Sequence, residues 1–252
     1  MLPTHHIILL FANLKSRTLN QIPPPTKFPP FTPRIYKSCV LYDQSISAHL
    51  EFKAKVNTTN PNRLLFTALL QNRLPETIPV FVKLINGQYG GEVHHLLAQH
   101  NFAPTLHAYS ELEGAPKAIV MGYLDPSSWM TLSAYSALPN TSRFAGPIRL
   151  ALNTVLTILL KNGKVHGDLR CPNVMVNVSS TGDLIYVNDE SGNMRPNIMV
   201  VDFDWAGDAG KVFYPLLRNA GITWPGHPGG PIQKGHDKKI VDSWWHNLIF
   251  AV

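Results

Sequence analysis

Three oxygen-bearing side chains in the second half of the chain have the types and spacing needed to bind a divalent metal ion and to receive a proton. Asp168 and Asn173 lie five residues apart in the string His-Gly-Asp-Leu-Arg-Cys-Pro-Asn, and Asp202 follows a hairpin later in Val-Asp-Phe-Asp. Carboxylate and amide oxygens are ligands that Mg²⁺ prefers, and a carboxylate can also accept the proton of a hydroxyl group. This layout is the one that phosphoryl transfer from a nucleotide requires.

A long amphipathic helix is expected immediately before the loop that carries Asp168. The pattern places this helix over residues 147–161, where the apolar residues repeat at helical spacing and so predict one buried face: Ile148, Leu152, Val155, Leu156 and Leu159. Strands are predicted at 174–178 and 197–202. The loop and Asp202 are therefore each expected to adjoin a strand.

A second group of elements is predicted upstream, around one lysine and one glutamate. Lys83 stands in a β-rich run over residues 76–86, whose alternating pattern is typical of a strand. Glu92 opens a segment whose apolar residues fit one face of a helix: Val93, Leu96 and Leu97. Residues 117–124 read as another buried strand.

The order of these elements, together with the two motifs, resembles the protein-kinase-like superfamily. The string around Asp168 is similar to the catalytic loop of that superfamily, and the string around Asp202 is similar to its metal-binding motif. The Asp-Phe-Asp ending and the long hairpin before it resemble most closely the kinase-like proteins of mushroom-forming fungi. The resemblance covers residues 76–210.

The resemblance implies an α+β, two-lobed protein-kinase-like fold. Only 50 residues follow Asp202, and no Ala-Pro-Glu string is among them, so a shortened C-terminal lobe is expected. Residues 41–124 are then the N-terminal lobe, and residues 125–252 are the abbreviated C-terminal lobe. Residues 1–40 are predicted to be a poorly ordered, Pro-rich basic extension, because prolines remove backbone donors and favour extended chain.

The resemblance also implies roles for four residues in catalysis and metal binding. Asp168 would accept the proton of the acceptor hydroxyl or orient that hydroxyl, and Arg170 would help to neutralise the transferred phosphate. Asn173 and Asp202 would bind the Mg²⁺ ion that bridges the phosphates. ATP and Mg²⁺ are therefore the expected cofactors.

Four more residues are implied in binding the nucleotide. Lys83 would hold the α- and β-phosphates, with Glu92 on the following helix as its ion-pair partner. Met121 and Tyr123, at the end of the buried strand over residues 117–124, would border the bound nucleotide.

The sequence departs from the pattern of the family in three places. No Gly-rich strand-turn-strand precedes Lys83, where only residues 57–62 offer a turn. Asp204 replaces the glycine of the usual Asp-Phe-Gly, and this added carboxylate would either join the metal shell or lock the loop. Residues 211–235 are rich in Pro and Gly, and a last helix is predicted over residues 236–250. The later helices that support the catalytic loop in the family are expected to be missing.

Two classes of function are compatible with these residues. The first is an ATP-dependent phosphotransferase that moves the γ-phosphoryl group to a hydroxyl, on protein Ser or Thr in the first instance. A small-molecule substrate stays open, because Gly167 stands where protein kinases usually carry arginine. The alternative is a pseudokinase or truncated binding module that scaffolds a partner without turnover, which the missing Gly-rich loop favours.

Charge and composition argue against nucleic-acid binding, a membrane span and a disulfide framework. Residues 1–60 carry seven Lys or Arg against two acidic residues, within a formal net charge of +6. These charges are scattered among prolines, so a solvated tail is favoured over nucleic-acid binding. No run reaches the roughly 18 apolar residues that a membrane span needs. Cys39 and Cys171 are too few for a disulfide framework, so the expected location is intracellular, in the reducing cytoplasm.

Overall fold

The computed structural model describes residues 38–40, 47–56, 63–71, 77–110, 116–189, 191–246 and 248. The chain divides into two units, residues 1–32 and residues 33–252, and the first unit lies outside the described residues. The predicted basic extension therefore falls almost wholly outside the described chain. Its last three residues, Ser38–Val40, form a strand.

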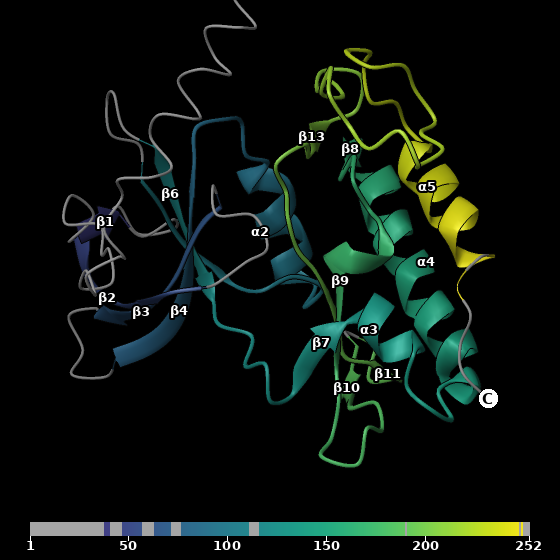
Figure 1. Cartoon of the computed structure of the whole chain (residues 1–252), viewed down its shortest axis with the longest axis horizontal. Helices are drawn as coiled ribbons and strands as arrows, with labels where there is room; N and C mark the ends of the chain where they lie inside the picture. Colours follow the sequence, from purple (N-terminus) through teal and green to yellow (C-terminus); the bar gives the residue numbers. More distant parts are fainter. Residues whose placement is uncertain are drawn as a thin grey trace, which may run out of the picture. The chain divides into compact units, whose positions relative to one another are not determined.

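A six-stranded antiparallel sheet is built from the first half of the described chain (Figure 1). Along its strands β3 and β4, buried residues alternate with partly exposed ones, so that one face of the sheet is buried. In spatial order the strands are β1 (Ser38–Val40), β2 (Ser47–Lys55), β3 (Leu64–Gln71), β4 (Thr77–Ile85), β6 (Lys117–Gly122) and β5 (Leu106–Ser110).

Strand β4 positions Lys83 by simple alternation. Val80, Val82 and Leu84 are buried in one cluster with the neighbouring strands. Because successive side chains of a strand point to opposite faces, Lys83 lies on the other face of the sheet. The predicted strand over residues 76–86 is thus present, and its one lysine is kept out of the apolar cluster.

Helix α2 (Gly91–Gln99) follows β4 and packs on the main core through Val93 and Leu97, which are fully buried. The spacing of these residues is the helical spacing from which the element was predicted. Its acidic residue Glu92 stands in the first turn, where a negative charge is favourable to the helix dipole.

The second half of the chain is dominated by two helices. Helix α4 (Ala145–Lys161) buries five residues on one face: Ile148, Ala151, Leu152, Val155 and Leu159. Helix α5 (His236–Trp245) lies beside α4, and an ion pair between Arg149 and Asp242 joins the two (Figure 1). Two shorter elements precede α4, namely α3 (Leu132–Ser136) and the 3₁₀ turn η1 (Ser142–Phe144).

Segment 142–161 is long and apolar enough to cross a membrane by length and composition alone. No such run was predicted from the sequence. In the structure this segment comprises η1 and helix α4, and one face of α4 packs into the main core beside Val241 of α5. Leu150 and Leu160 on the same helix are exposed.

Short strands around α4 hold the two motifs in place. Strand β9 (Val174–Asn177) lies between β12 (Ile198–Val200) and β7 (Trp129–Thr131), and β13 (Gly207–Asp208) pairs with β8 (Lys164–Val165). The 3₁₀ turn η2 (Cys171–Asn173) leads into β9. The polar hairpin consists of β10 (Tyr186–Asn188) and β11 (Met194–Pro196). The Asp168 loop therefore lies between β8 and β9, and Asp202 directly follows β12.

Candidate active site

Asp168 is the most strongly bonded residue of the loop. Its carboxylate accepts hydrogen bonds from the Nε atom of Arg170 and, at 2.8 Å, from the Nη2 atom of the same side chain. The Nδ2 atom of Asn173 donates to the Oδ2 atom of Asp168 over 2.9 Å and to its backbone oxygen over 2.8 Å. The three residues predicted from the string around Asp168 therefore form one hydrogen-bonded group.

The backbone of this loop is held from α5. Asp237 is buried, and its two carboxylate oxygens accept the N–H of His166 over 2.7 Å and the N–H of Gly167 over 2.8 Å. The indole Nε1 atom of Trp244 donates to the backbone oxygen of Leu169 over 2.9 Å. The predicted last helix, α5, therefore supports this loop through a buried carboxylate that takes up two loop donors, a contact that was not predicted from the sequence.

An aromatic stack joins the loop to α2 and to the Asp202 motif. The ring of Phe203 stacks on His94 with centroids 4.5 Å apart, and it meets His166 edge to face at 5.1 Å. His94 is fully buried; its Nε2 atom donates to the oxygen of Pro104 over 2.7 Å, so its Nδ1 atom accepts from the hydroxyl of Tyr89 at 2.6 Å. Burial lowers the pKa of His94 to about 4. This histidine is therefore a neutral packing residue.

Lys83 and Asp202, 119 residues apart in sequence, meet in the site. The Nζ atom of Lys83 donates to Asp202 and also to both carboxylate oxygens of Asp204, each at 2.7 Å. Asp202 has a φ of 71°, in the left-handed region that side chains other than glycine rarely adopt. Such backbone strain gathers at functional sites, where the surrounding structure holds it.

The two aspartates respond differently to the same lysine. Burial raises the pKa of Asp202, but the charge and hydrogen bond of Lys83 outweigh it and hold that pKa below its usual range. For Asp204, burial raises the pKa, and the nearby charge of Asp202 adds to that effect against the attraction of Lys83. Asp202 is therefore the more readily ionised member of the pair.

Glu92 does not take the predicted place beside Lys83. Its Oε2 atom instead accepts a hydrogen bond from Lys164 at 2.6 Å, and Lys164 also bonds to Asp208 over 2.7 Å. Glu92 stands in the first turn of α2, with most of its side chain in solvent. The predicted ion pair between Lys83 and Glu92 is thus wrong.

A cavity of about 280 Å³ opens beside these groups. Its polar lining includes Lys83, Asn173 and Asp202, and the rest is largely apolar: Leu65, Phe81, Met121, Met175 and Val201. Met121 therefore lines the same cavity as Lys83. Tyr123 is 36% exposed and is not among the lining residues. A mostly apolar cavity with a few charged and polar groups in its lining is typical of sites that bind small molecules or cofactors.

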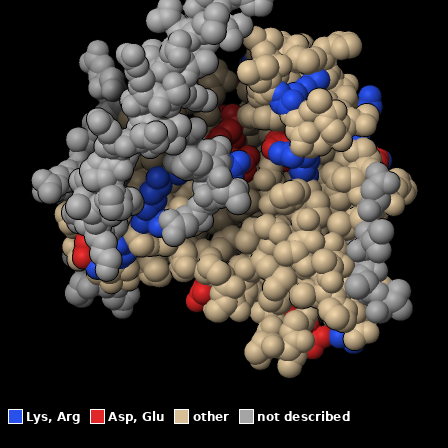
Figure 2. All heavy atoms as spheres, in the orientation of Figure 1, with Lys and Arg blue, Asp and Glu red and all other residues tan. Residues whose placement is uncertain are grey.

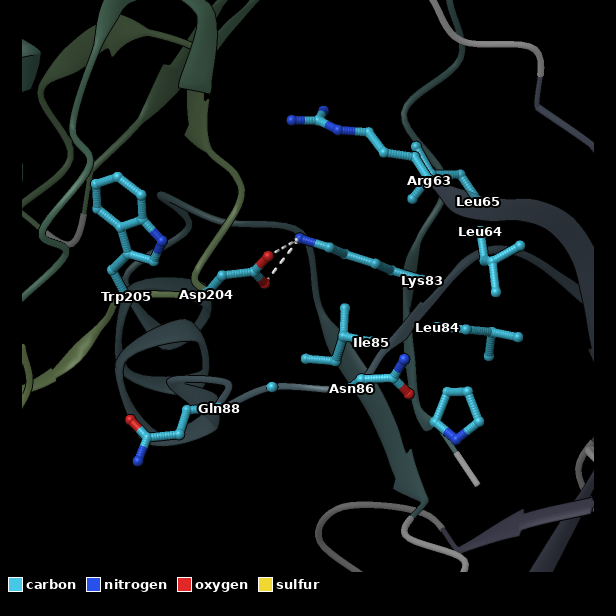
Figure 3. Close-up of a pocket in the computed structure, with 12 residues that line it drawn as sticks. Arg63, Leu64, Leu65, Lys83, Leu84, Ile85, Asn86, Gln88, Asp204 and Trp205 are labelled. Carbon is cyan, nitrogen blue, oxygen red and sulfur yellow. Dashed lines mark hydrogen bonds and ion pairs between the residues drawn. The ribbon is translucent and has the colours of Figure 1, made fainter. Parts of the chain in front are cut away.

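A second cavity of about 410 Å³ shares Lys83, Leu65 and Arg63 with the first. Figure 3 shows the side chains of Arg63 and Lys83 extending toward the side where Asp204 lies. Arg63 precedes β3 and makes no ion pair with any residue that the structure describes. This cation was not predicted from the sequence, because a single arginine beside a turn belongs to no motif.

The hairpin upstream of Lys83 is present although it lacks glycines. Strands β2 and β3 pair in antiparallel fashion, with Lys55 opposite Phe66, and the turn over residues 57–62 lies outside the described chain. Arg63 is the first described residue after that turn. The hairpin therefore adjoins the cavity, and it brings a side-chain cation to it.

The residues present suit a magnesium ion. Both Asn173 and Asp202 line the smaller cavity, and because the Nδ2 atom of Asn173 donates to Asp168, its amide oxygen is left as an acceptor. Hard oxygen donors from two residues, completed by phosphate and water, are a usual Mg²⁺ environment. Within the described part of the chain, no group of three or more His, Cys, Asp or Glu could hold a metal by itself.

The segment after Asp204 closes over the loop with aromatic residues. The guanidinium of Arg170 lies 5.4 Å from the ring centroid of Trp224, and the rings of Trp205 and Trp224 are 5.3 Å apart. In the space-filling view, acidic side chains with basic ones beside them gather in a hollow between the sheet and the helices (Figure 2). Opposite charges are thus concentrated in this hollow.

Comparison with known proteins shows the fold. No family model matches the sequence, and no curated protein matches it. Among solved structures, the kinase PK-1 of Cydia pomonella granulovirus is similar, with a TM-score of 0.52 and 16% sequence identity. The match covers 79% of this chain and 68% of the viral kinase. This chain has an α+β protein-kinase-like fold.

Proposed function

We propose that this protein is an ATP- and Mg²⁺-dependent phosphotransferase that moves the γ-phosphoryl group to a hydroxyl. The observation that carries this proposal is the meeting of Lys83, Asp202 and Asn173 around one cavity, although the sequence separates them widely. The two-lobed arrangement, the closeness to fungal kinase-like proteins and the cytoplasmic location belong to the same proposal.

Each charged group has a place in such a reaction. Lys83 and Arg63 would neutralise the phosphates, and Asn173 and Asp202 would hold Mg²⁺, which supplies charge neutralisation when it is bound. Phosphoryl transfer asks little covalent chemistry of the protein, so positioned charges are the main requirement. Met121 would contact the base, because it is an apolar lining residue of the smaller cavity.

Asp168 would receive or orient the acceptor hydroxyl. Its carboxylate already accepts three hydrogen bonds from Arg170 and Asn173, so an acceptor hydroxyl must compete with these donors for it. Of the two donors Arg170 has the longer side chain, and once released it could bind the transferred phosphate. Protein Ser or Thr is the proposed acceptor, and a small-molecule hydroxyl is the other.

A binding module without turnover is the second candidate. The bidentate contact of Arg170 with Asp168 favours it, because the guanidinium occupies both carboxylate oxygens that an acceptor hydroxyl would have to approach. The hairpin before Lys83 has no glycine to bring its backbone close to phosphates. In that case nucleotide would bind, but its γ-phosphate would stay.

Thermal shift with ATP, in the presence and absence of Mg²⁺, tests the binding step. Release or transfer of labelled γ-phosphate, compared between the wild type and Asp168→Asn, tests the chemistry. Binding with turnover that Asp168→Asn abolishes supports the transferase. Binding with no turnover in either protein supports the binding module. ATP stabilisation that persists in the double variant Lys83→Ala/Asp202→Ala would show that the nucleotide site lies elsewhere.

A further inference from the structure

We propose that Asp204 is the positioning carboxylate of Lys83, and that it replaces a glutamate on helix α2 in this role. The inference rests on the proposed nucleotide-binding function of Lys83. The inference goes beyond that function, because it names the residue on which the orientation of Lys83 depends.

The hydrogen bonds of Lys83 carry the inference. Its Nζ atom lies 2.7 Å from each oxygen of Asp204, a bidentate arrangement, whereas Asp202 accepts through one oxygen. The pair is partly buried, with 16% of the Lys83 side chain and 36% of the Asp204 side chain exposed. An ion pair that is shielded on one side and doubly bonded orients an ammonium group better than an exposed one.

Helix α2 has no room for a side chain at Gly90, its N-cap residue, where it meets the motif. Gly90 caps this helix, and its N–H donates to the oxygen of Phe203 over 2.9 Å. A Cβ atom added at Gly90 would lie 2.5 Å from the Cβ atom of Ala206 and 2.6 Å from its backbone oxygen. A side chain at this position is therefore excluded by contact with the segment that follows Asp204.

The acidic residue that α2 does carry is used elsewhere. Glu92 and Asp208 share the ammonium of Lys164, at 2.6 and 2.7 Å. This bridge ties the first turn of α2 to strands β8 and β13. Glu92 thus attaches the helix to the loop segments, and the orientation of Lys83 does not depend on it.

The contact with Asp204 would leave Lys83 with an acceptor when a divalent ion binds to Asp202. When Asp202 turns to a divalent ion, Lys83 would lose an acceptor, and a partly buried ammonium without one is costly. Asp204 keeps that acceptor in place. This role explains the aspartate at the third position of the Asp-Phe-Asp motif: Asp204 supplies the carboxylate that was expected from helix α2.

Two double-mutant cycles on the folding equilibrium test the pairing without any need for activity. The first cycle combines Lys83→Met with Asp204→Asn, and the second combines Lys83→Met with Glu92→Gln. We expect a coupling of about fivefold to tenfold in the first cycle and none in the second, since only contacting residues couple. Equal coupling in both cycles, or coupling in the second alone, overturns the proposal.

Steady-state kinetics test the functional consequence in the whole protein. We expect Asp204→Asn to lower kcat about tenfold with a KM for ATP within about threefold, Asp204→Glu to restore part of the loss, and Glu92→Gln to leave both constants near the wild type. If Asp204→Asn instead raises only the Mg²⁺ concentration needed for half-maximal rate, Asp204 is a metal ligand and the inference fails. A wild type that does not turn over counts against the proposed transferase, and the cycles still decide the pairing.

Discussion

Asp237 accepts the backbone N–H of His166 over 2.7 Å, across 71 residues of sequence, and so joins the last described helix to the loop that carries Asp168. The second oxygen of the same carboxylate takes the N–H of Gly167. A buried carboxylate that accepts from two backbone N–H groups fixes the path of the loop, because a buried N–H group without an acceptor is costly.

The substitution Asp237→Asn should loosen this attachment. Asparagine keeps one acceptor and turns an NH₂ group toward a backbone N–H, so we expect the free energy of unfolding to fall by about 2 kcal/mol. Denaturant titration measures this change. The matched control is Asp242→Asn on the same helix, which removes partly exposed ion pairs to Arg149 and Lys238 and should cost less than about 1 kcal/mol. A larger loss in the control would contradict the role given to Asp237.

Gly90→Ala should destabilise the protein, mainly because the added methyl group has no room, and in part because alanine is a poorer N-cap residue than glycine. The new methyl group would overlap Ala206 at 2.5 Å, and the backbone there must move, with an expected cost of about 1–3 kcal/mol. Gly146→Ala in α4 is the control, because nothing lies within 4 Å of its added Cβ atom. That control should be neutral or stabilise by up to about 1 kcal/mol. Thermal unfolding of the two variants side by side gives the answer, and similar behaviour of both would refute the close contact.

Arg63→Ala should weaken nucleotide binding in proportion to the number of phosphates. Arg63 lines both cavities together with Lys83 and has no acidic partner among the described residues. Loss of one partly solvated phosphate contact should lower the affinity for ATP about tenfold and leave the affinity for adenosine unchanged. Calorimetric titration with ATP, ADP and adenosine measures the series.

The control for Arg63 is Arg143→Ala, since Arg143 bonds to Asp183 and lines neither cavity. An equal loss for adenosine and ATP in Arg63→Ala would mean that the residue shapes the pocket and does not bind phosphate.

Stability should fall in mild acid because of His94. Its folded pKa of about 4 lies below the ordinary value of 6.5, so the unfolded chain takes up a proton first as the pH drops. The stability supplied by the neutral ring is fully present above pH 6.5 and is lost progressively toward pH 4. Between pH 8 and pH 5 this single residue should cost about 2 kcal/mol.

The variant His94→Gln keeps polar atoms for Tyr89 and Pro104 but does not titrate. It should be less stable than the wild type at pH 8 and should lose about 2 kcal/mol less on going to pH 5, as denaturant titrations at the two pH values would show. Burial also lowers the pKa of His107 and His236, and these residues act equally in both proteins. An identical loss in the two proteins would show that His94 is not the group responsible.

Much of the fold followed from local patterns. The strand that carries Lys83, the helix α4 and the helix α5 were each predicted from periodicity, because apolar residues at a spacing of two or of three to four mark one buried face. The group of Asp168, Arg170 and Asn173 was likewise readable, since all three belong to one short loop. Short-range spacing is sufficient where the chain itself brings the residues together.

The partner of Lys83 was not readable in this way. A glutamate nine residues later was the natural prediction, and the structure pairs the lysine with an aspartate 121 residues away. Asp237 and Arg63 were missed for the same reason, because neither belongs to a motif and each acts only where distant segments meet.

The sequence alone determined which groups could do the chemistry and the order of the elements that carry them. Tertiary structure decided which carboxylate holds the lysine, which helix supports the loop and which further cation faces the cavity. These choices depend on the space left between packed segments, as at Gly90 against Ala206, and on the desolvation of charges that meet there. Both quantities arise from contacts between residues far apart along the chain.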